Sequence, residues 1–197
     1  MIKETVGNAL TIPCNFVAHQ VNCRGKMGAG IAKAIREQTP PEEYEKYVRL
    51  CEEKTAEELL GQVQFMQGNN KTFCNIFGQD NYSGFTSMTD YSALARAFTL
   101  LLANYDREDV TICIPGYLGC GLAGGSWNIV FDRILLPRFA QSKALLIICY
   151  MDLAPLRDMF AQVPKDENGR MLIPWHGFEA GLPADTVASY LDAIGKF

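Results

Sequence analysis

The sequence predicts an α/β protein in which helices cover both faces of one mixed central sheet. Two observations support this prediction. Apolar runs of strand length alternate with longer stretches of helical period, and two glycine-rich loops each follow such a run and precede a helical stretch. The runs predicted as strands are Ile2 to Val6, Phe16 to Asn22, Gln62 to Met66, Thr72 to Phe77, Val110 to Ile114 and Ala144 to Tyr150.

The third and fourth runs are close enough in the sequence to form a hairpin. The residues between them, Gln67 to Asn70, read QGNN. A Gly-Asn pair supplies the positive φ angles of a tight turn, so these two strands are predicted to be antiparallel. The other strands are separated by helical stretches, which makes the predicted sheet mixed.

Helices are predicted in the stretches between the strands. They run from Gly28 or Ala29 to about Glu37, from Glu42 to Lys54, from a Thr89 N-cap to about Tyr105, and from a Ser126 cap through Trp127 to Leu136. The third has apolar side chains at i, i+3, i+4 and i+7, which predicts a core-facing helix and not a cofactor site. Pro137 is expected to end or kink the fourth.

The chain is predicted to fold as one domain with an appended segment. Its 197 residues can bury one sizeable core but not two ordinary ones. The sequence changes character after Tyr150, so residues 1–152 are assigned to the main domain and 153–197 to a C-terminal helical extension. Helices near Leu153 to Ala161 and around Ala184 to Ile194 are expected to pack on the same domain, because roughly 45 residues cannot bury an adequate core alone.

Composition argues against several classes of function. A net charge of -4 and a pI near 5.2 are not those of a general nucleic-acid-binding protein. No stretch reaches 18 apolar residues, so no membrane association is expected. The seven cysteines include no CxxC pair, which favours reduced thiols in a cytoplasmic protein over disulfides or a metal site. No cofactor is expected.

Two glycine-rich loops are the segments best suited to chemistry. Asn22 to Gly30 reads NCRGKMGAG, and Ile114 to Trp127 reads IPGYLGCGLAGGSW. In such a loop several backbone N–H groups converge on an anion, and the following helix adds the positive end of its dipole. Two loops predict a ligand with two phosphates, or a phosphate flanked by sugars. Glycine also serves tight turns and close packing, so a structural role is the alternative.

Two common nucleotide motifs fit the chain poorly. The Walker A pattern GxxxxGK[ST] is absent. Gly119, Gly121 and Gly124 fit the dinucleotide pattern GxGxxG, but the acidic residue that follows the next predicted strand is Asp152, 28 positions beyond Gly124. The acidic residue of a dinucleotide site is expected after roughly 20 positions. The glycine pattern alone therefore does not establish an NAD site.

The order of these segments resembles the macro domain family of ADP-ribose-binding proteins. The likeness rests on AHQVNCRGKMGAGIAKAIREQTPPEEYEKYVRLCE, then LGQV, NIFGQ and IPGYLGCGLAGGSW, and it covers residues 1–152. The chain is most similar to the branch that contains the yeast-type ADP-ribose-1″-phosphate phosphatase and the terminal ADP-ribose-protein glycohydrolase. The resemblance implies a three-layer α/β/α domain. The extension has no counterpart in it.

The resemblance also implies a set of ligand-binding residues. Asn8 takes the place of an acidic side chain that accepts a hydrogen bond from adenine. Tyr150 matches an aromatic residue beside adenine, with a position at the rim of the core as the alternative. Asn22 matches the asparagine that holds the distal ribose hydroxyls. The first loop would wrap the distal ribose and its phosphate, and the second would donate amides to the diphosphate, through Gly25, Lys26, Met27, Gly28, Gly30, Ile31, Gly119, Cys120, Gly121, Leu122, Ala123, Gly124 and Gly125.

His19 corresponds to the histidine proposed as catalytic in the phosphatase, with Asn22 beside it in the catalytic set. A neutral imidazole near the phosphate can act as general base for water or as general acid for the leaving oxygen. His19 lies three residues before Asn22 on a strand, so the two side chains point to opposite faces unless a bulge intervenes. A buried, hydrogen-bonded core histidine is the alternative. His176, in the extension, is expected at the surface.

Two positions depart from the glycohydrolase, which uses a lysine after its fourth strand and an aspartate after GCGL. Gln79 or Asp80 and Ala123 stand there in this chain, so a lysine-dependent mechanism is not expected. Gln79 is expected to hydrogen-bond a ribose or phosphate oxygen instead. The resemblance thus implies binding of ADP-ribose and hydrolysis of ADP-ribose-1″-phosphate without a metal. The alternatives are a non-catalytic reader of ADP-ribose or of ADP-ribosylated macromolecules, and a hydrolase of another ADP-ribose linkage.

Overall fold

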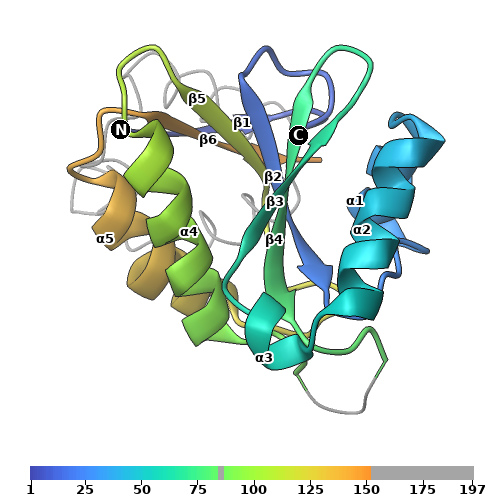
Figure 1. Cartoon of the computed structure of the whole chain (residues 1–197). Coiled ribbons are helices and arrows are strands. Elements are labelled where there is room, and N and C mark those ends of the chain that lie inside the picture. Colours follow the sequence, from blue (N-terminus) through green and yellow to red (C-terminus); the bar gives the residue numbers. More distant parts are fainter. Residues whose placement is uncertain (84–86, 152–197) are drawn as a thin grey trace, which may run out of the picture.

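A single six-stranded sheet forms the centre of the molecule (Figure 1). The structure is a computed structural model that describes residues 1–83 and 87–151. All six predicted strands are confirmed, with bounds within two residues of those expected. They are β1 (Ile2–Val6), β2 (Phe16–Asn22), β3 (Val63–Gln67), β4 (Thr72–Gln79), β5 (Thr111–Pro115) and β6 (Leu145–Tyr150).

The sheet is mixed, as predicted. Its strand order is β1-β6-β5-β2-β4-β3, and β3 pairs with β4 antiparallel while the other neighbouring pairs are parallel. Because β2 lies between β5 and β4, the ends of these three strands meet at one edge. The two glycine-rich loops follow β2 and β5, so this topology brings them together.

The hairpin between β3 and β4 forms, but not through the backbone angles that the sequence suggested. The Gly68 N–H donates to the Lys71 carbonyl oxygen at 2.8 Å. None of the residues 68 to 70 has a positive φ. Glycine is required at position 68 for space instead, because a Cβ there would lie 2.5 Å from Cε2 of Phe73.

Helices cover both faces of the sheet. Those described are α1 (Gly30–Glu37), α2 (Pro41–Glu53), α3 (Ala56–Leu59), α4 (Tyr91–Tyr105), the π-helix η1 (Ile129–Leu135) and α5 (Leu136–Phe139). Figure 1 shows α1 and α2 on one side of the sheet and α4 and α5 on the other. The three-layer α/β/α arrangement is confirmed. The predicted helices of the extension, together with Asp152 and His176, lie outside the described residues.

Two predicted helix ends need correction. Asp90, not Thr89, is the N-cap of α4: its Oδ1 accepts a hydrogen bond from the Ala93 N–H at 2.9 Å, while the Thr89 hydroxyl donates to the Gly119 carbonyl oxygen. The helix before Pro137 does not end there but changes from π-helical η1 to α5 at Leu136. At this transition the Arg138 guanidinium donates a hydrogen bond to the Ile134 carbonyl oxygen at 2.9 Å.

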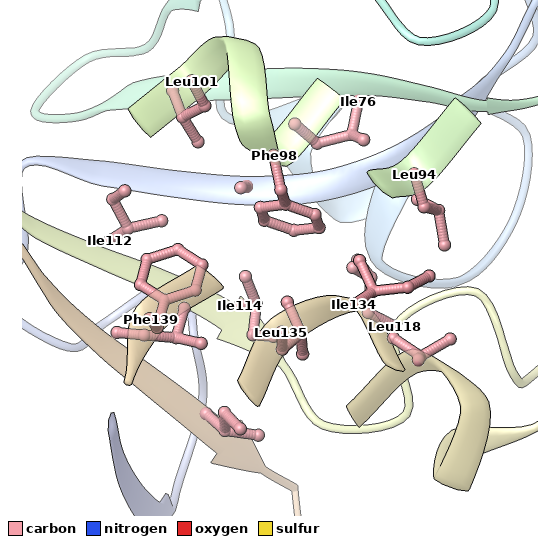
Figure 2. Packing of buried hydrophobic residues seen from close by; sticks show 14 of the residues in the cluster. Ile76, Leu94, Phe98, Leu101, Ile112, Ile114, Leu118, Ile134, Leu135 and Phe139 are labelled. Atoms are coloured by element: carbon pink, nitrogen blue, oxygen red, sulfur yellow. The ribbon is translucent and has the colours of Figure 1, made fainter. Parts of the chain in front are cut away.

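Apolar side chains fill the layer between the sheet and α4, η1 and α5 (Figure 2). Leu94, Phe98 and Leu101 of α4 are all at most 1% exposed, which confirms the core-facing stripe of that helix. Burying each such side chain contributes about 1.5–3 kcal/mol to folding. They pack against side chains of the opposing helices, the sheet and the second glycine loop, among them Ile76, Ile112, Ile114, Leu118, Ile134, Leu135 and Phe139.

A second cluster fills the layer under α1 and α2. It joins Val17 and Val21 of β2 to Phe73 and Phe77 of β4, with Tyr47 of α2 fully buried among them. Because β2 is covered on both faces, its carboxyl end is held firmly. In the described part of the chain, no helix is long and apolar enough to cross a bilayer.

Candidate functional site

A cavity of about 750 Å³ opens at the carboxyl ends of β2, β4 and β5. Parallel α/β sheets place ligands at this edge, where loops from neighbouring strands diverge. Its walls are the end of β2, the first glycine loop with the start of α1, and the second glycine loop. The lining residues are Gln20, Val21, Asn22, Lys26, Met27, Gly28, Ala29, Gly30, Ile31, Ala32, Arg36, Tyr44, Gln79, Tyr82, Met88, Pro115, Gly116, Tyr117, Leu118, Gly119, Gly121, Leu122 and Ala123.

Asn22 shapes the first loop with its side-chain amide. Its Oδ1 accepts hydrogen bonds from the N–H groups of Arg24 at 3.0 Å and Lys26 at 3.2 Å, and its Nδ2 donates to the Lys26 carbonyl oxygen at 2.7 Å. The Tyr47 hydroxyl donates to the Asn22 carbonyl oxygen at 2.6 Å. The loop is thus closed on itself and tied to α2, which fixes the position of the amides that follow.

The start of α1 leaves backbone donors for a ligand. Its N-cap, Ala29, makes no side-chain capping bond, and its first turn contains no acidic residue. The first N–H groups of a helix have no intrahelical partners, and the helix dipole favours an anion beside them. A Cβ placed on Gly28 or Gly30 would meet no atom within 4 Å, so both glycines border open space.

The second loop depends on left-handed backbone angles. Tyr117, Gly119 and Gly124 have φ values of 61°, 72° and 68°. The Gly119 carbonyl oxygen accepts hydrogen bonds from the Thr89 hydroxyl at 2.5 Å and the Gly125 N–H at 2.9 Å, so it turns away from any ligand. A Cβ on Gly121 would meet no atom within 4 Å. The loop is therefore held by hydrogen bonds at Gly119 and borders open space at Gly121.

Two glutamines join the loops at the floor of the cavity. The Gln20 Nε2 donates to Gln79 Oε1 at 2.6 Å and to the Thr89 hydroxyl at 3.1 Å. The Gln79 Nε2 donates to the Asn81 carbonyl oxygen at 2.6 Å. The Gln20 Oε1 is buried and has no hydrogen-bond partner among the described residues. This oxygen packs between the backbones of Gly78 and Gly119, since a Cβ on either glycine would lie within 2.8 Å of it.

The charges that line the cavity are positive. Lys26 and Arg36 are the cationic side chains, and the described lining contains no aspartate, glutamate, histidine or cysteine. Arg36 lies over the ring of Tyr44, with 5.5 Å between its Cζ and the ring centroid. In a chain with a net charge of -4, this arrangement favours an anionic ligand.

The structure brings most of the predicted ligand-binding residues together. Those that line the cavity are Asn22, Lys26, Met27, Gly28, Gly30, Ile31, Gln79, Gly119, Gly121, Leu122 and Ala123. Gly25, Cys120, Gly124 and Gly125 belong to the same loops but are not part of the lining. Gly25 instead packs against α2, since a Cβ there would lie 3.3 Å from the Cα of Val48. Its φ of 68° also requires glycine.

Asn8 and Tyr150 do not line the cavity. The Asn8 Oδ1 accepts a hydrogen bond from the Leu10 N–H at 2.9 Å, so the oxygen expected to meet adenine stabilises a local turn. Tyr150 is 4% exposed, and its hydroxyl donates to Glu4 Oε1 at 2.9 Å. Burial raises the pKa of both Glu4 and Tyr150. Tyr117 packs edge-on against Tyr150 at 5.5 Å and is the aromatic residue that reaches the cavity.

His19 faces the core and not the cavity, which corrects the expected catalytic placement. The residue is completely buried on the face covered by α1 and α2, and its Nε2 lies 2.7 Å from Asn75 Oδ1. Burial lowers the pKa of the imidazole to about 4. A register shift does occur in β2, between Val21 and Asn22, but it comes after His19 and leaves that side chain inside. The core alternative is the one that the structure supports.

Several lining residues were not predicted from the sequence, among them Gln20, Arg36, Tyr44, Tyr82, Met88 and Tyr117. The sequence does indicate Gln20 as a site residue, because it is a polar residue in an apolar strand two positions before Asn22. The side chains of Arg36 and Tyr44 come from α1 and α2. Their place at the cavity depends on how these helices pack on the sheet, and helix packing is not visible as a local pattern in the sequence.

The fold and the cavity define an α/β domain with a cavity between two glycine loops whose charged lining residues are cationic. The macro domain family model matches residues 18–134, more than half of the chain. The chain belongs to the macro domain family. A comparison with curated protein sequences gave no match.

Solved structures share the fold at low sequence identity. A Bacteroides thetaiotaomicron protein of unknown function is 22% identical with a TM-score of 0.65, over 76% of this chain and 98% of that one. The macrodomain of Mycobacterium tuberculosis DarG is 22% identical with a TM-score of 0.63, over 76% and 97%. Thermosipho africanus DarTG in complex with ADP-ribose is 20% identical with a TM-score of 0.55, over 70% of this chain and 38% of that one.

Proposed function

We propose that the protein binds ADP-ribose in the cavity between the two glycine loops. The observation that carries the proposal is the combination of free loop amides with two cationic side chains, Lys26 and Arg36, and no acidic one in the described lining. Membership of the macro domain family and the ADP-ribose complex of the Thermosipho protein support the choice of anion.

Each part of the ligand has a partner in this proposal. The diphosphate accepts hydrogen bonds from the amides of the second loop and of the start of α1. The distal ribose lies by Asn22, whose amide closes the first loop. The adenine stacks on Tyr117 in place of the buried Tyr150. The seven free thiols, all within the described residues, support the cytoplasmic location expected from the sequence.

Calorimetry with ADP-ribose tests the binding. The variant Gly121→Val places a branched side chain into the open space in front of the second loop and is expected to weaken binding by about tenfold or more. Leu100→Ala is the matched control, because Leu100 is 40% exposed on α4, away from the cavity. No heat of binding with the unmodified protein, or full affinity in Gly121→Val, would contradict the proposal.

Hydrolysis of ADP-ribose-1″-phosphate is the finer activity that we propose for the same site. The uncapped start of α1 and the exposed Lys26 favour a terminal phosphate at the first loop. In the reaction a water oxygen attacks phosphorus, the bond from phosphorus to the ribose oxygen breaks, and that oxygen takes up a proton. Because the described lining has no carboxylate or imidazole, water itself supplies the proton and the amides stabilise the phosphoryl oxygens.

Phosphate release distinguishes this activity from a reader. The full chain is incubated with ADP-ribose-1″-phosphate and free phosphate is followed, beside the variant Lys26→Gln. Hydrolysis that falls several-fold in this variant supports the proposal. Tight binding of ADP-ribose with no phosphate release would overturn the phosphatase and leave the reader, or a hydrolase of ADP-ribosylated macromolecules. The latter is then assayed with an ADP-ribosylated protein.

A further inference from the structure

Two cysteines, Cys14 and Cys113, belong to the apolar cluster under α1 and α2, near the end of β2 opposite the ligand cavity. Cys14 lies in the segment before β2 and is half-buried, and Cys113 lies in β5 and is fully buried. Cys113 is level with Val17 in the pairing of β5 with β2, so it lies close to the start of that strand. Figure 1 shows this end of the sheet, with the β3–β4 hairpin, opposite the segment that follows β4.

The hairpin brings a cation to Cys14. The Lys71 Nζ lies 3.9 Å from the Cys14 Sγ and also donates a hydrogen bond to the Ile12 carbonyl oxygen. Lys71 lines a second cavity of about 390 Å³, formed with Leu10, Thr11, Gln38, Asn69, Asn70 and Phe73. The residue whose ammonium group stands beside the thiol thus also borders this cavity.

The surroundings of Cys14 favour its thiolate. The thiol of Cys113 hydrogen-bonds to Cys14 and, with the charge of Lys71, outweighs burial, which lowers the pKa of Cys14 to about 7. The Cys113 thiol also has the Ile114 carbonyl oxygen at 3.9 Å as a weak second acceptor. The other six cysteines, all in the described residues, have raised pKa values, including the half-buried Cys51 and Cys120. The thiolate is the nucleophilic form of cysteine, so Cys14 differs from the rest in reactivity.

We propose that Cys14 is an oxidation site at which a hydroperoxide produces a sulfenic acid that Cys113 converts into a disulfide. In the first step the Cys14 sulfur attacks one peroxide oxygen, the O–O bond breaks, and the second oxygen leaves as hydroxide or alkoxide, which takes up a proton. In the second step the Cys113 sulfur attacks Cys14 and the sulfenic oxygen leaves as water with the Cys113 proton. Two thiols are oxidised and one peroxide is reduced.

The oxidation site is independent of the ligand cavity. Neither cysteine lines that cavity, and none of its lining residues borders the second one. ADP-ribose binding is therefore not required for the reaction, and the failure of one proposal leaves the other intact. A thiol reductant of low molecular weight returns the disulfide to the starting pair by exchange.

Alkylation of the full chain tests the reactivity of Cys14. The protein is treated with iodoacetamide over a series of pH values, and each cysteine is followed by peptide mass spectrometry. Near pH 7, Cys14 is expected to react about tenfold faster than Cys51 and Cys120, which serve as half-buried controls in the same molecule. The alkylation rate of Cys14 is expected to rise with pH around a midpoint near pH 7. The variant Lys71→Met is expected to move this midpoint to a higher pH. Equal rates at the three cysteines would overturn the proposal.

Oxidation with hydrogen peroxide tests the disulfide. The unmodified protein is expected to lose two hydrogen atoms and to yield a crosslinked Cys14–Cys113 peptide. The variant Cys113→Ser is expected to accumulate a sulfenic acid at Cys14 that dimedone traps, and Cys113→Ala, which keeps the buried position apolar, replaces it where the serine variant does not fold. The absence of trapped sulfenic acid in the folded variant would refute Cys14 as the site. Oxidation of Cys14 without a disulfide in the unmodified protein would refute Cys113 as its partner.

Discussion

At the scale of single residues, Gly116 is packed tightly against the buried Tyr150 at the wall of the cavity. Gly116 stands against the ring of Tyr150, which is held by a hydrogen bond to Glu4 and by the rings of Tyr117 and Trp127. The wall of the cavity is thus supported by a buried aromatic side chain that does not itself reach the ligand. Tyr150 supports the cavity wall through its ring contact with Tyr117.

Gly116→Ala is expected to destabilise the fold. The new Cβ would lie 2.2 Å from Cδ1 of Tyr150, and the ring has no free direction in which to move. Overpacking of this kind costs about 1–3 kcal/mol. Urea unfolding measures the loss, with Gly121→Ala as the control, since a Cβ at Gly121 meets nothing within 4 Å and is expected to change stability by less than about 0.5 kcal/mol. Equal stability of the two variants would contradict the packing seen here.

His19 is expected to make the fold sensitive to acid. Burial holds the imidazole pKa at about 4, below the ordinary 6.5, so the unfolded chain takes up a proton first as the pH falls. The contribution of the neutral imidazole to the free energy of unfolding is fully present above about pH 6.5 and is lost as the pH falls towards about 4. Between about pH 7 and about pH 4.5 the imidazole accounts for about 2 kcal/mol of lost stability.

The variant His19→Gln isolates this effect. Its free energy of unfolding is measured at both pH values beside that of the unmodified protein, and the carboxylates that titrate in the same range are common to both. The loss on acidification is expected to be smaller by about 2 kcal/mol in the variant. An identical loss in both proteins would show that His19 is not a neutral core residue.

At the scale of elements, the start of α4 links the core to the second glycine loop. Asp90 caps the helix, and the preceding Thr89 donates its hydroxyl proton to the Gly119 carbonyl oxygen and accepts a hydrogen bond from Gln20. Asp90 thus stabilises the helix, whereas its neighbour Thr89 stabilises the second glycine loop. The helix that forms the core layer therefore also positions the loop that borders the cavity.

Asp90→Ala is expected to lower the free energy of unfolding by about 1 kcal/mol, because the Ala93 N–H loses its acceptor. Asp90→Asn retains an oxygen acceptor at the cap, so its free energy of unfolding is expected to fall by only a few tenths of the loss in Asp90→Ala. Thermal and urea unfolding of the pair give the difference. A loss as large in the asparagine variant as in the alanine variant would argue against capping.

The same region shows what the sequence can predict. Strands were found within two residues because buried apolar runs mark them directly. The cap of α4 was misplaced by one residue, since Thr89 and Asp90 are both good caps and only the tertiary contact with Gly119 separates them. The short helix α3 was missed although Thr55 and Glu58 form a capping box, a signal visible in the sequence. Arg36 and Tyr44 reach the cavity through helix packing, which no local pattern encodes.

At the scale of the whole molecule, the parallel pairing of β2 with β5 brings together loops that are about 90 residues apart in the chain. The cavity at one end of these strands is lined by two cations, and the thiols lie nearer the other end. The fold thus separates the proposed anion site from the proposed oxidation site by the length of a strand. Each can be tested without disturbing the other.

Binding of ADP-ribose is expected to weaken with ionic strength. Lys26 and Arg36 lie at an open cavity, where salt screens their attraction for the diphosphate. Raising sodium chloride from about 0.05 M to about 0.5 M is expected to raise the Kd by about three- to tenfold. In the double variant Lys26→Gln with Arg36→Gln, affinity falls and most of this salt dependence disappears, while adenosine, which has no charge, responds little in either protein. A salt dependence as steep in the double variant as in the unmodified protein would mean that amide dipoles, and not these two side chains, attract the ligand.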